Sequence, residues 1–298
     1  MKIQGLSKKI DEKMIFEDIH IVLSTNQITG LIGRNGVGKT SLFRTIAGHY
    51  LPDSGDITIC GGSLNNEPNL RQHIFYIDEQ YSFFASQNLK AISAYYAVNY
   101  PDFDTEKFKS MLNDYKLANT LRYRSMSKGM QGLFKMILAV ASNAKYLFLD
   151  EPFDGLDVIV RKNVIRLLLN HLSEKNVSVM ISSHNLNELE TIIDRALLMK
   201  ETKITQDIRL EDFKTKARKL QLVFKEQETS SWLVENATSI RKEGRVLTVV
   251  FEQYTQEIEQ KISEMQPILN EELPLTLEDF FEANLANDDD YQFLEQGV

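Results

Sequence analysis

The sequence predicts an α/β fold with a buried parallel sheet, followed by a small C-terminal α+β domain, and three observations support this prediction. A glycine-rich segment, GRNGVGKTS at residues 33–41, lies between the apolar run ITGLIG and the helix-like run SLFRTIAG. A second apolar run, at residues 146–149, ends in the acidic pair Asp150 and Glu151. Such short apolar runs are typical of buried strands in a parallel sheet. After Asp212 the pattern changes to apolar runs on either side of a turn, which indicates a separate domain.

The glycine-rich segment has the spacing of a phosphate-binding loop. Its glycines allow backbone NH groups to turn inward around a triphosphate, and Lys39 is placed to reach the β and γ phosphates. The hydroxyl group of Thr40 is placed to bind Mg²⁺, and the next helix presents its positive N-terminus to the phosphates. The segment therefore predicts ATP and Mg²⁺ as cofactors. The predicted nucleotide contacts within it are Asn35, Gly36, Val37, Gly38, Lys39, Thr40 and Ser41.

The acidic pair at the end of the second apolar run predicts the chemistry. A central parallel strand delivers its last residues to the open end of the sheet, so Asp150 is expected to hold Mg²⁺. Glu151 lies one residue further, where its carboxylate can orient and polarise an attacking water as general base. The alternative, that the pair merely caps the next helix, would be preferred only if no phosphate-binding loop lay upstream. ATP hydrolysis is the predicted reaction.

A third segment, SKGMQ at residues 127–131, completes a diagnostic order of motifs. From Met1 to about Asp212 the chain resembles the nucleotide-binding subunit of an ATP-binding cassette (ABC) transporter. The resemblance implies a P-loop NTPase cassette with a RecA-like core, an antiparallel β patch and an inserted helical subdomain. It also implies that the third segment closes over the γ phosphate held by a second subunit. Two ATP molecules are then sandwiched in a head-to-tail dimer.

The third segment departs from the usual signature of the family. Ser127 and Gly129 match its serine and second glycine and are implied nucleotide contacts. The usual pattern is LSGGQ, whereas this chain has MSKGM, so Lys128 replaces a glycine and Met130 replaces the glutamine. Lys128 is interpreted either as an extra phosphate contact or as a solvent-exposed residue at the start of a helix. The second interpretation is favoured, because lysine side chains are mostly exposed.

The SKGM variant and the segment YPDFDTEKF at residues 100–108 resemble one branch of the family. This branch comprises bacterial ATPases of the type 2 export kind, which serve bacitracin resistance, multidrug export or peptide export, including export of phenol-soluble modulins. Their permeases are separate polypeptides. The resemblance implies a separate transmembrane permease and a second ABC ATPase subunit as partners, in a homodimer or a heterodimer.

Two further motifs follow the acidic pair. FDGLD matches the D-loop of the family, and its Asp157 is implied to touch the partner subunit and to link the two ATP sites. ISSH ends another apolar run, and its His184 matches the switch histidine. The resemblance assigns this residue a catalytic role in sensing the γ phosphate, whereas a histidine after a strand is otherwise usually structural.

Two binding positions are less regular. Alignment on residues 74–77 puts Glu79 at the place of the glutamine that lies near Mg²⁺ in the family, but Gln80 is adjacent and could serve instead. Both could also be exposed loop residues without a role in the site. Ile10 stands where the family usually stacks an aromatic ring on adenine, while Phe16 suits the core-facing start of the second strand. Modest affinity for the base is expected, because an aliphatic side chain cannot stack.

Composition limits the function classes. The 298 residues exceed one ordinary domain, and the 43% hydrophobic content can fill a substantial core. No run approaches the roughly 20 apolar residues that span a bilayer, and the N-terminus has no signal-peptide core, so we expect a cytoplasmic protein, peripheral at the inner face of the membrane. The single cysteine, Cys60, excludes an internal disulfide. The net charge of −8 argues against a nucleic-acid partner.

Two alternatives from other function classes remain open. A soluble ABC ATPase acting on ribosomes or nucleic acid shares the nucleotide chemistry, but such proteins usually carry two cassettes or a long coiled coil. This chain has one phosphate-binding loop and no sustained heptads. An importer ATPase is the other alternative, since only the SKGM branch favours export.

The predicted organisation is a nucleotide-binding domain at 1–212, with a helical subdomain inserted at about 81–145, and an accessory domain at 213–298 with an acidic tail. The helical subdomain is expected to face the permease. Its aromatic cluster is interpreted either as a docking surface or, more often for such spacing, as core. The cluster comprises Tyr95, Tyr96, Tyr100 and Phe103.

In the accessory domain, apolar runs at 219–225 and 245–254 predict strands on either side of a turn at 242–244. Residues 257–269 predict a helix with one apolar face, which can form a satellite core or a dimer contact. The segment 275–285 resembles the terminal helix of the family, and the acidic tail after it is expected to be solvated.

Overall fold

The computed structural model describes residues 1–78, 84–225, 230–279 and 281, which form two units. The first comprises Met1–His184 and Arg195–Gln206, and the second comprises Asn185–Asp194 and residues 207–298. The predicted boundary after Asp212 stays a prediction, because the second unit also includes a segment that directly follows His184. None of the described helices is long and apolar enough to cross a membrane.

A six-stranded sheet forms the centre of the first unit, with the strand order β10-β9-β3-β8-β7-β6. β3 pairs in parallel with β8 and β9, and β7 pairs in parallel with β6 and β8. The central strands are buried along almost their whole length, which explains their continuous apolar runs. The strands are β3 (Gln27–Ile32), β6 (Ile74–Ile77), β7 (Tyr146–Asp150), β8 (Ser178–Ser183), β9 (Arg195–Lys200) and β10 (Lys203–Arg209).

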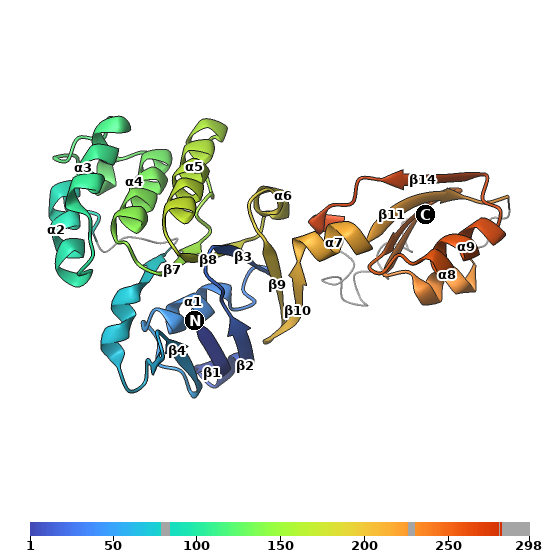
Figure 1. Ribbon diagram of the computed structural model, residues 1–298, viewed down its shortest axis with the longest axis horizontal. Helices are drawn as coiled ribbons and strands as arrows, with labels where there is room; N and C mark the ends of the chain where they lie inside the picture. Colours follow the sequence, from blue (N-terminus) through green and yellow to red (C-terminus); the bar gives the residue numbers. More distant parts are fainter. Residues whose placement is uncertain (79–83, 226–229, 280, 282–298) are drawn as a thin grey trace. The chain divides into compact units, whose positions relative to one another are not determined.

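A smaller sheet of strand order β2-β1-β4-β5 forms the antiparallel patch. Helix α1 (Lys39–Ile46) lies between this patch and the central sheet (Figure 1). Its Phe43 and Ile46 are fully buried among side chains of both sheets, and so is Phe16 of β2, as predicted. The strands are β1 (Lys2–Ile10), β2 (Lys13–Val22), β4 (Ser54–Ile59) and β5 (Gly62–Ser63). The sequence prediction of an α/β cassette is confirmed.

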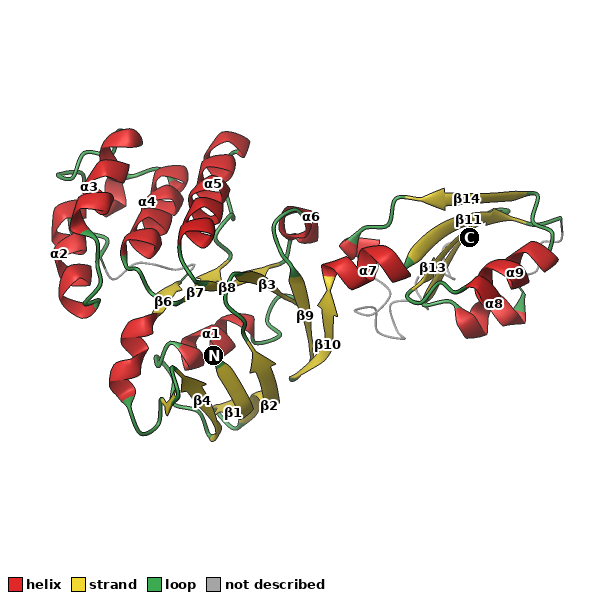
Figure 2. Ribbon diagram, viewed as in Figure 1, coloured by secondary structure: helices red, strands yellow, loops and turns green. Residues whose placement is uncertain are grey.

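Helices gather beyond the other face of the central sheet (Figure 2). α2 and α3 lie within the predicted helical subdomain, and each begins at a side-chain cap, Asn88 and Asp104 respectively. The first residues of the predicted helical subdomain, 81–83, lie outside the described residues. The helices are α2 (Leu89–Asn99), α3 (Thr105–Asp114), α4 (Lys128–Ala141) and α5 (Val158–Glu174), with 3₁₀ turns at Pro68–His73 and Tyr123–Ser125.

The second unit contains an antiparallel sheet of strand order β12-β13-β11-β14, whose apolar face packs with α8 and α9 around Leu222, Val249 and Ile262. The predicted turn joins β12 to β13, so the strand before it is β12 and not the run at 219–225, which forms β11. The elements are α6 (Leu186–Glu190), α7 (Leu210–Lys216), β11 (Arg218–Val223), α8 (Ser231–Asn236), β12 (Ser239–Glu243), β13 (Val246–Phe251), α9 (Gln256–Glu264) and β14 (Leu269–Leu273).

The predicted helix at 257–269 is too long, since α9 ends at Glu264. Gln266 has a φ of 49° and Pro267 cannot continue a helix, so Leu269 begins β14 instead of extending the apolar helical face. Ile262 is fully buried, which confirms the core interpretation for this helix. Residues 277–279 and 281 are helical, as the terminal segment predicts, and the acidic tail lies outside the described residues.

His171, in the last turn of α5, is expected to make stability depend on pH. Its side chain is 1% exposed, and within the described part of the chain neither ring nitrogen has a hydrogen-bond partner. Burial lowers its pKa from 6.5 to about 4. Because the folded state disfavours the protonated ring, its contribution is complete above pH 6.5 and is lost as the pH falls towards 4.

The loss is expected to reach about 3 kcal/mol in the free energy of unfolding. His171→Leu should flatten this part of the pH profile in urea unfolding measured from pH 7 to pH 4.5. His20→Gln, at an exposed histidine, is the matched control. An unchanged profile in His171→Leu would contradict the prediction.

Candidate active site

The loop between β3 and α1 surrounds the ammonium group of Lys39. Gly36 and Gly38 have φ values of 80° and 114°, which side-chain-bearing residues rarely adopt. Lys39 is 6% exposed, and its Nζ donates to the carbonyl oxygen of Gly33 at 2.7 Å and to that of Arg34 at 3.3 Å. Burial lowers the pKa of Lys39, and the negative charges of Glu151 and Asp150 oppose this effect. The loop therefore presents one buried cation at the N-terminus of α1.

The end of β7 carries the two carboxylates predicted from the sequence. Parallel pairing places Asp150 opposite Ser182 of β8, whose hydroxyl group donates to the Asp150 carboxylate. The hydroxyl group of Tyr76 donates to the same carboxylate at 3.4 Å. Burial and the charge of Asp150 raise the pKa of Tyr76, which keeps this donor protonated. Asp150 is 1% exposed and is thus held by donors from both neighbouring strands.

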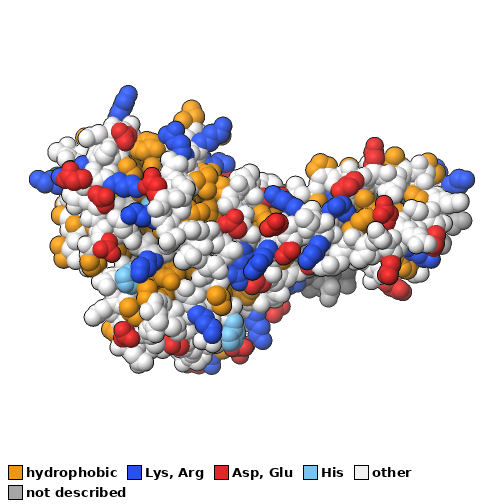
Figure 3. Space-filling model, in the orientation of Figure 1, with side chains coloured by type: hydrophobic (Ala, Val, Ile, Leu, Met, Phe, Trp, Pro, Cys, Tyr) orange, Lys and Arg blue, Asp and Glu red, His pale blue; other side chains and the backbone are white. Residues whose placement is uncertain are grey.

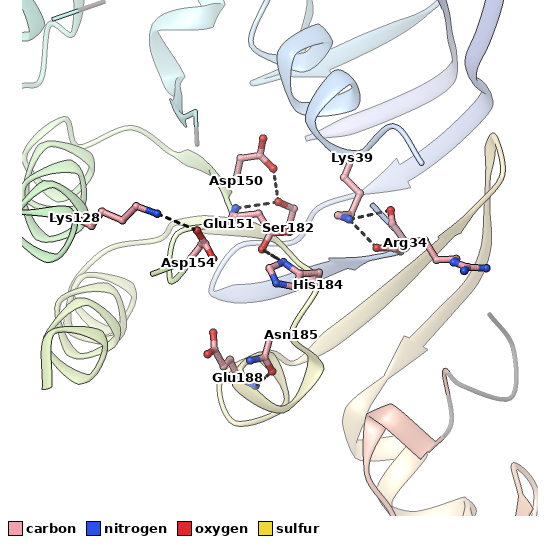
Figure 4. Close-up of polar contacts among 11 residues, drawn as sticks. Arg34, Lys39, Lys128, Asp150, Glu151, Asp154, Ser182, His184, Asn185 and Glu188 are labelled. Carbon is pink, nitrogen blue, oxygen red and sulfur yellow. Dashed lines mark hydrogen bonds and ion pairs between the residues drawn. The ribbon is translucent and has the colours of Figure 1, made fainter. Parts of the chain in front are cut away.

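Glu151 and His184 face each other at the ends of β7 and β8 (Figure 4). His184 Nδ1 lies 3.0 Å from Glu151 Oε2, and the His184 backbone NH donates to the same oxygen at 3.3 Å. Glu151 has a φ of 44°, a left-handed conformation that is strained for this residue type. Its backbone NH is fixed by Ser182, through the carbonyl and hydroxyl oxygens, each at 3.2 Å. The surroundings therefore fix the direction in which this carboxylate points.

Lys39, Glu151 and His184 line one cavity of about 420 Å³. The buried cation of Lys39 lies on one side of it, and the Glu151–His184 pair lies on the other. The lining residues are Ile15, Asn35, Gly36, Gly38, Lys39, Thr40, Ser41, Glu151, Asp154 and His184. The loop, the strand-end carboxylate and the histidine, which are far apart in the sequence, thus meet at one nucleotide-sized hollow. We refer to it below as the cradle.

The comparisons agree with this arrangement. The family model described as "ABC transporter" matches residues 16–154. The ABC transporter ATP-binding protein YtrB of Bacillus subtilis (strain 168) is 29% identical over 286 residues, covering 96% of this chain and 98% of that protein. The chain is an ABC transporter ATP-binding subunit.

Other similarities come from the same family. The bacitracin transport ATP-binding protein BcrA of Bacillus licheniformis is 28% identical over 224 residues, covering 74% of this chain and 72% of that protein. A solved structure, described as the ATP binding subunit of an ABC transporter, superposes with a TM-score of 0.65 at 22% identity, covering 72% of this chain and 91% of that one. The structural likeness shows the fold, and the family is one of ATPases.

In this ABC subunit, one predicted signature residue and one predicted D-loop residue act as helix caps. Ser127 caps α4 by accepting from the Met130 backbone NH at 3.2 Å. Asp157 caps α5 by accepting from the backbone NH groups of Ile159 and Val160, each at 2.9 Å. Ser127, Gly129 and Asp157 do not line the cradle of their own chain, and their contacts with a second subunit stay predictions.

The expected contact between Ile10 and adenine stays a prediction. Ile10 is not among the lining residues, whereas Ile15 of β2 lines the cradle and lies against Gly38. Val37, predicted as a nucleotide contact, packs against the apolar core below the loop. Glu79 and Gln80 lie outside the described residues.

Sequence reasoning missed three residues of the site: Ile15, Asp154 and Ser182. Asp154 lies within the FDGLD segment and lines the cradle, whereas the family resemblance assigns a role to Asp157, the last residue of that motif. Ser182 could have been found from its register, because it follows the same kind of apolar run as Asp150 and ends a neighbouring strand. The sequence gives no comparable signal for Ile15, because its surroundings are those of an ordinary strand residue.

Proposed function

We propose that this ATPase hydrolyses ATP in the cradle, with Mg²⁺, and powers export through a separate permease at the inner face of the cell membrane. The observation that supports the site most strongly is the convergence of Lys39, Glu151 and His184 on one cavity of about 420 Å³. A buried cation binds the phosphates, and a fixed carboxylate opposite it can accept a proton from water.

The loop and the start of α1 bind the phosphates in this proposal. Lys39 is already directed into the loop, so its ammonium group can exchange the carbonyl oxygens of Gly33 and Arg34 for phosphate oxygens. The NH groups at the N-terminus of α1 add favourable dipoles. Ile15 can cover one face of the base, and without an aromatic ring it contributes burial but no stacking.

The donor set near the loop fits Mg²⁺. Thr40 and Asp150 offer a hydroxyl and a carboxylate oxygen, the hard ligands that this ion prefers. Ser182 and Tyr76 hold the Asp150 carboxylate in place, as partners of a metal-binding carboxylate commonly do. When bound, the ion would neutralise charge on the β and γ phosphates.

Glu151 is proposed as the general base and His184 as its partner and sensor of the γ phosphate. The 3.0 Å contact between His184 Nδ1 and Glu151 Oε2 orients the carboxylate, and the strained backbone at Glu151 keeps it at the cradle. Water held by the carboxylate would attack the γ phosphorus and transfer a proton to Glu151, while the bond from the γ phosphorus to the β–γ bridging oxygen breaks and ADP leaves. The His184 side chain is 52% exposed, so its imidazole remains accessible to the nucleotide.

A second hollow supports docking of a permease. It has a volume of about 900 Å³ and is lined by Tyr95, Tyr96 and Tyr100, together with Arg71 and Asp78 and other residues. Tyr96 is 8% exposed and packs in the core, while Tyr95 is 48% exposed, which supports the docking interpretation for the exposed ring. An open aromatic hollow with charged groups at its side suits a cytoplasmic helix of a membrane subunit.

Export is favoured by the SKGM segment and by similarity to a protein named for bacitracin transport, and drugs or amphipathic peptides are the proposed cargo. Another relative is named for import of Fe(3+) ions, so direction needs a direct test. On the face drawn in Figure 3, Lys and Arg are interspersed with Asp and Glu, which offers no basic track for nucleic acid.

The test is reconstitution of the chain with the membrane subunit that copurifies with it, in liposomes whose cassettes face outward. Externally added ATP should drive labelled bacitracin or an amphipathic peptide into the lumen, which corresponds to export. Lys39→Ala is the inactive control. Movement of cargo only out of the lumen would contradict export, and absence of any membrane partner would contradict the transporter assignment.

A further inference from the structure

Lys128 places a positive charge where a helix disfavours it. It is the first residue of α4, at the positive end of the helix dipole, and no acidic residue lies in the first turn of that helix. The side chain is 75% exposed, so packing does not require a lysine here. The charge is therefore expected to have an anionic partner outside the helix.

The partner within the chain is Asp154, in the turn that follows Glu151. Lys128 Nζ lies 3.9 Å from Asp154 Oδ2, and Figure 4 shows the side chain reaching from α4 towards this carboxylate. The side chain passes close to Gly155, whose φ is 66°. A Cβ atom there would lie 3.0 Å from Lys128 Cδ and 3.2 Å from its Nζ. The turn thus has a glycine where the lysine passes.

Two apolar contacts also join the first turns of α4 to the segment that follows Asp154. A Cβ atom on Gly132 would lie 2.9 Å from Leu156 Cδ2, and one on Gly129 would lie 3.3 Å from Val160 Cγ2. The first turns of α4 therefore lie close against residues 154–160. The ion pair of Lys128 with Asp154 adds a charged contact to these apolar contacts.

Asp154 belongs both to the turn and to the cradle. Its backbone NH donates to the Glu151 carbonyl oxygen at 3.2 Å, and its side chain lines the cradle beside Glu151. A carboxylate at this place repels a nucleotide polyphosphate unless a cation balances it. Movement of Asp154 would also change the turn that begins at Glu151.

We propose that Lys128 is a positioning residue for ATP hydrolysis, which pairs with Asp154 and offsets the charge of that carboxylate beside Glu151 at the cradle. This role rests on the proposed nucleotide site and acts within one chain. It differs from both interpretations of the sequence, in which Lys128 is a contact to phosphate or an exposed residue without a role.

The experiment is a double-mutant cycle on the full chain, with ATPase kcat and KM measured separately. Lys128→Gln should lower kcat/KM about two- to five-fold, the range for an exposed ion pair. Asp154→Asn in the Lys128→Gln background should restore it, because the unbalanced charge is then absent. Lys128→Arg should retain activity. Lys109→Gln, the same change at an exposed lysine of α3 that pairs with Glu106, is the matched control.

Each other outcome overturns the proposal. A Lys128→Gln defect that Asp154→Asn does not relieve would show that Lys128 acts on phosphate directly. A Lys128→Gln protein as active as Lys109→Gln would show that Lys128 has no role in turnover. Lys39→Ala is measured in parallel. Its full activity would overturn the proposed nucleotide site itself, whereas its inactivity combined with a failed cycle overturns only the role of Lys128.

Discussion

Glu151→Gln is expected to lower kcat for ATP hydrolysis by about 10²- to 10⁴-fold while leaving ATP binding intact. The amide cannot accept a proton from water, yet it has nearly the same shape and keeps the contact with His184, which now lies 3.0 Å from Glu151 Oε2. Steady-state turnover and equilibrium binding of a fluorescent ATP analogue measure the two effects separately. Undiminished hydrolysis would assign the base to another residue.

Glu151→Gln also tests whether the partner cassette is an identical chain. If identical chains sandwich nucleotide, blocked hydrolysis should accumulate the closed dimer, and the light-scattering mass should double when ATP and Mg²⁺ are added. A monomer that still binds ATP would instead indicate an unlike partner cassette. Asp154→Asn is a suitable comparison, because it removes a carboxylate from the same cradle without removing the proposed base.

Lys39→Ala is expected to lower kcat/KM for ATP by about 10²- to 10³-fold, the effect of removing one well-placed electrostatic contact from a transition state. Lys39 is 6% exposed and its ammonium group lies inside the loop, so water cannot fully replace its interaction with the phosphates. Nucleotide titration and turnover measure the loss. Lys13→Ala, at an exposed lysine of β2, controls for the change in net charge.

Loss of the Lys39 contacts also leaves the Gly33 and Arg34 carbonyl oxygens without this donor. A thermal melt must therefore show that Lys39→Ala remains folded before its activity is interpreted. A folded variant with normal turnover would contradict the proposed site.

Local sequence was sufficient for the parts of the fold whose physics is local. Apolar runs that end in Asp150 or precede His184 indicated buried parallel strands, and glycines with Lys39 indicated the loop. Helix starts were predictable near Ser127 because a serine before an apolar helical run is a capping signal. Where a local signal was overlooked, the prediction was wrong: Gln266 and Pro267 end α9 earlier than the apolar spacing indicated.

Contacts between distant segments needed the tertiary structure. Ser182 reaches Asp150 because β7 and β8 pair in parallel with that register, and a shift of one residue would turn the hydroxyl group to the other face. Ile15, and not Ile10, lines the cradle because of how β2 approaches the loop at Gly38. Spacing along the chain carries no information about such approaches.

The sequence by itself determined the family, the ATPase chemistry and the identity of Lys39, Glu151 and His184 as site candidates, because motifs of fixed spacing encode them. Only the tertiary structure decided that Asp154 joins them at the cradle and that Lys128 reaches Asp154 across Gly155. The physical reason is that a motif specifies residues along one short segment, whereas the electrostatic balance of a site depends on every charge that packing brings within a few ångströms.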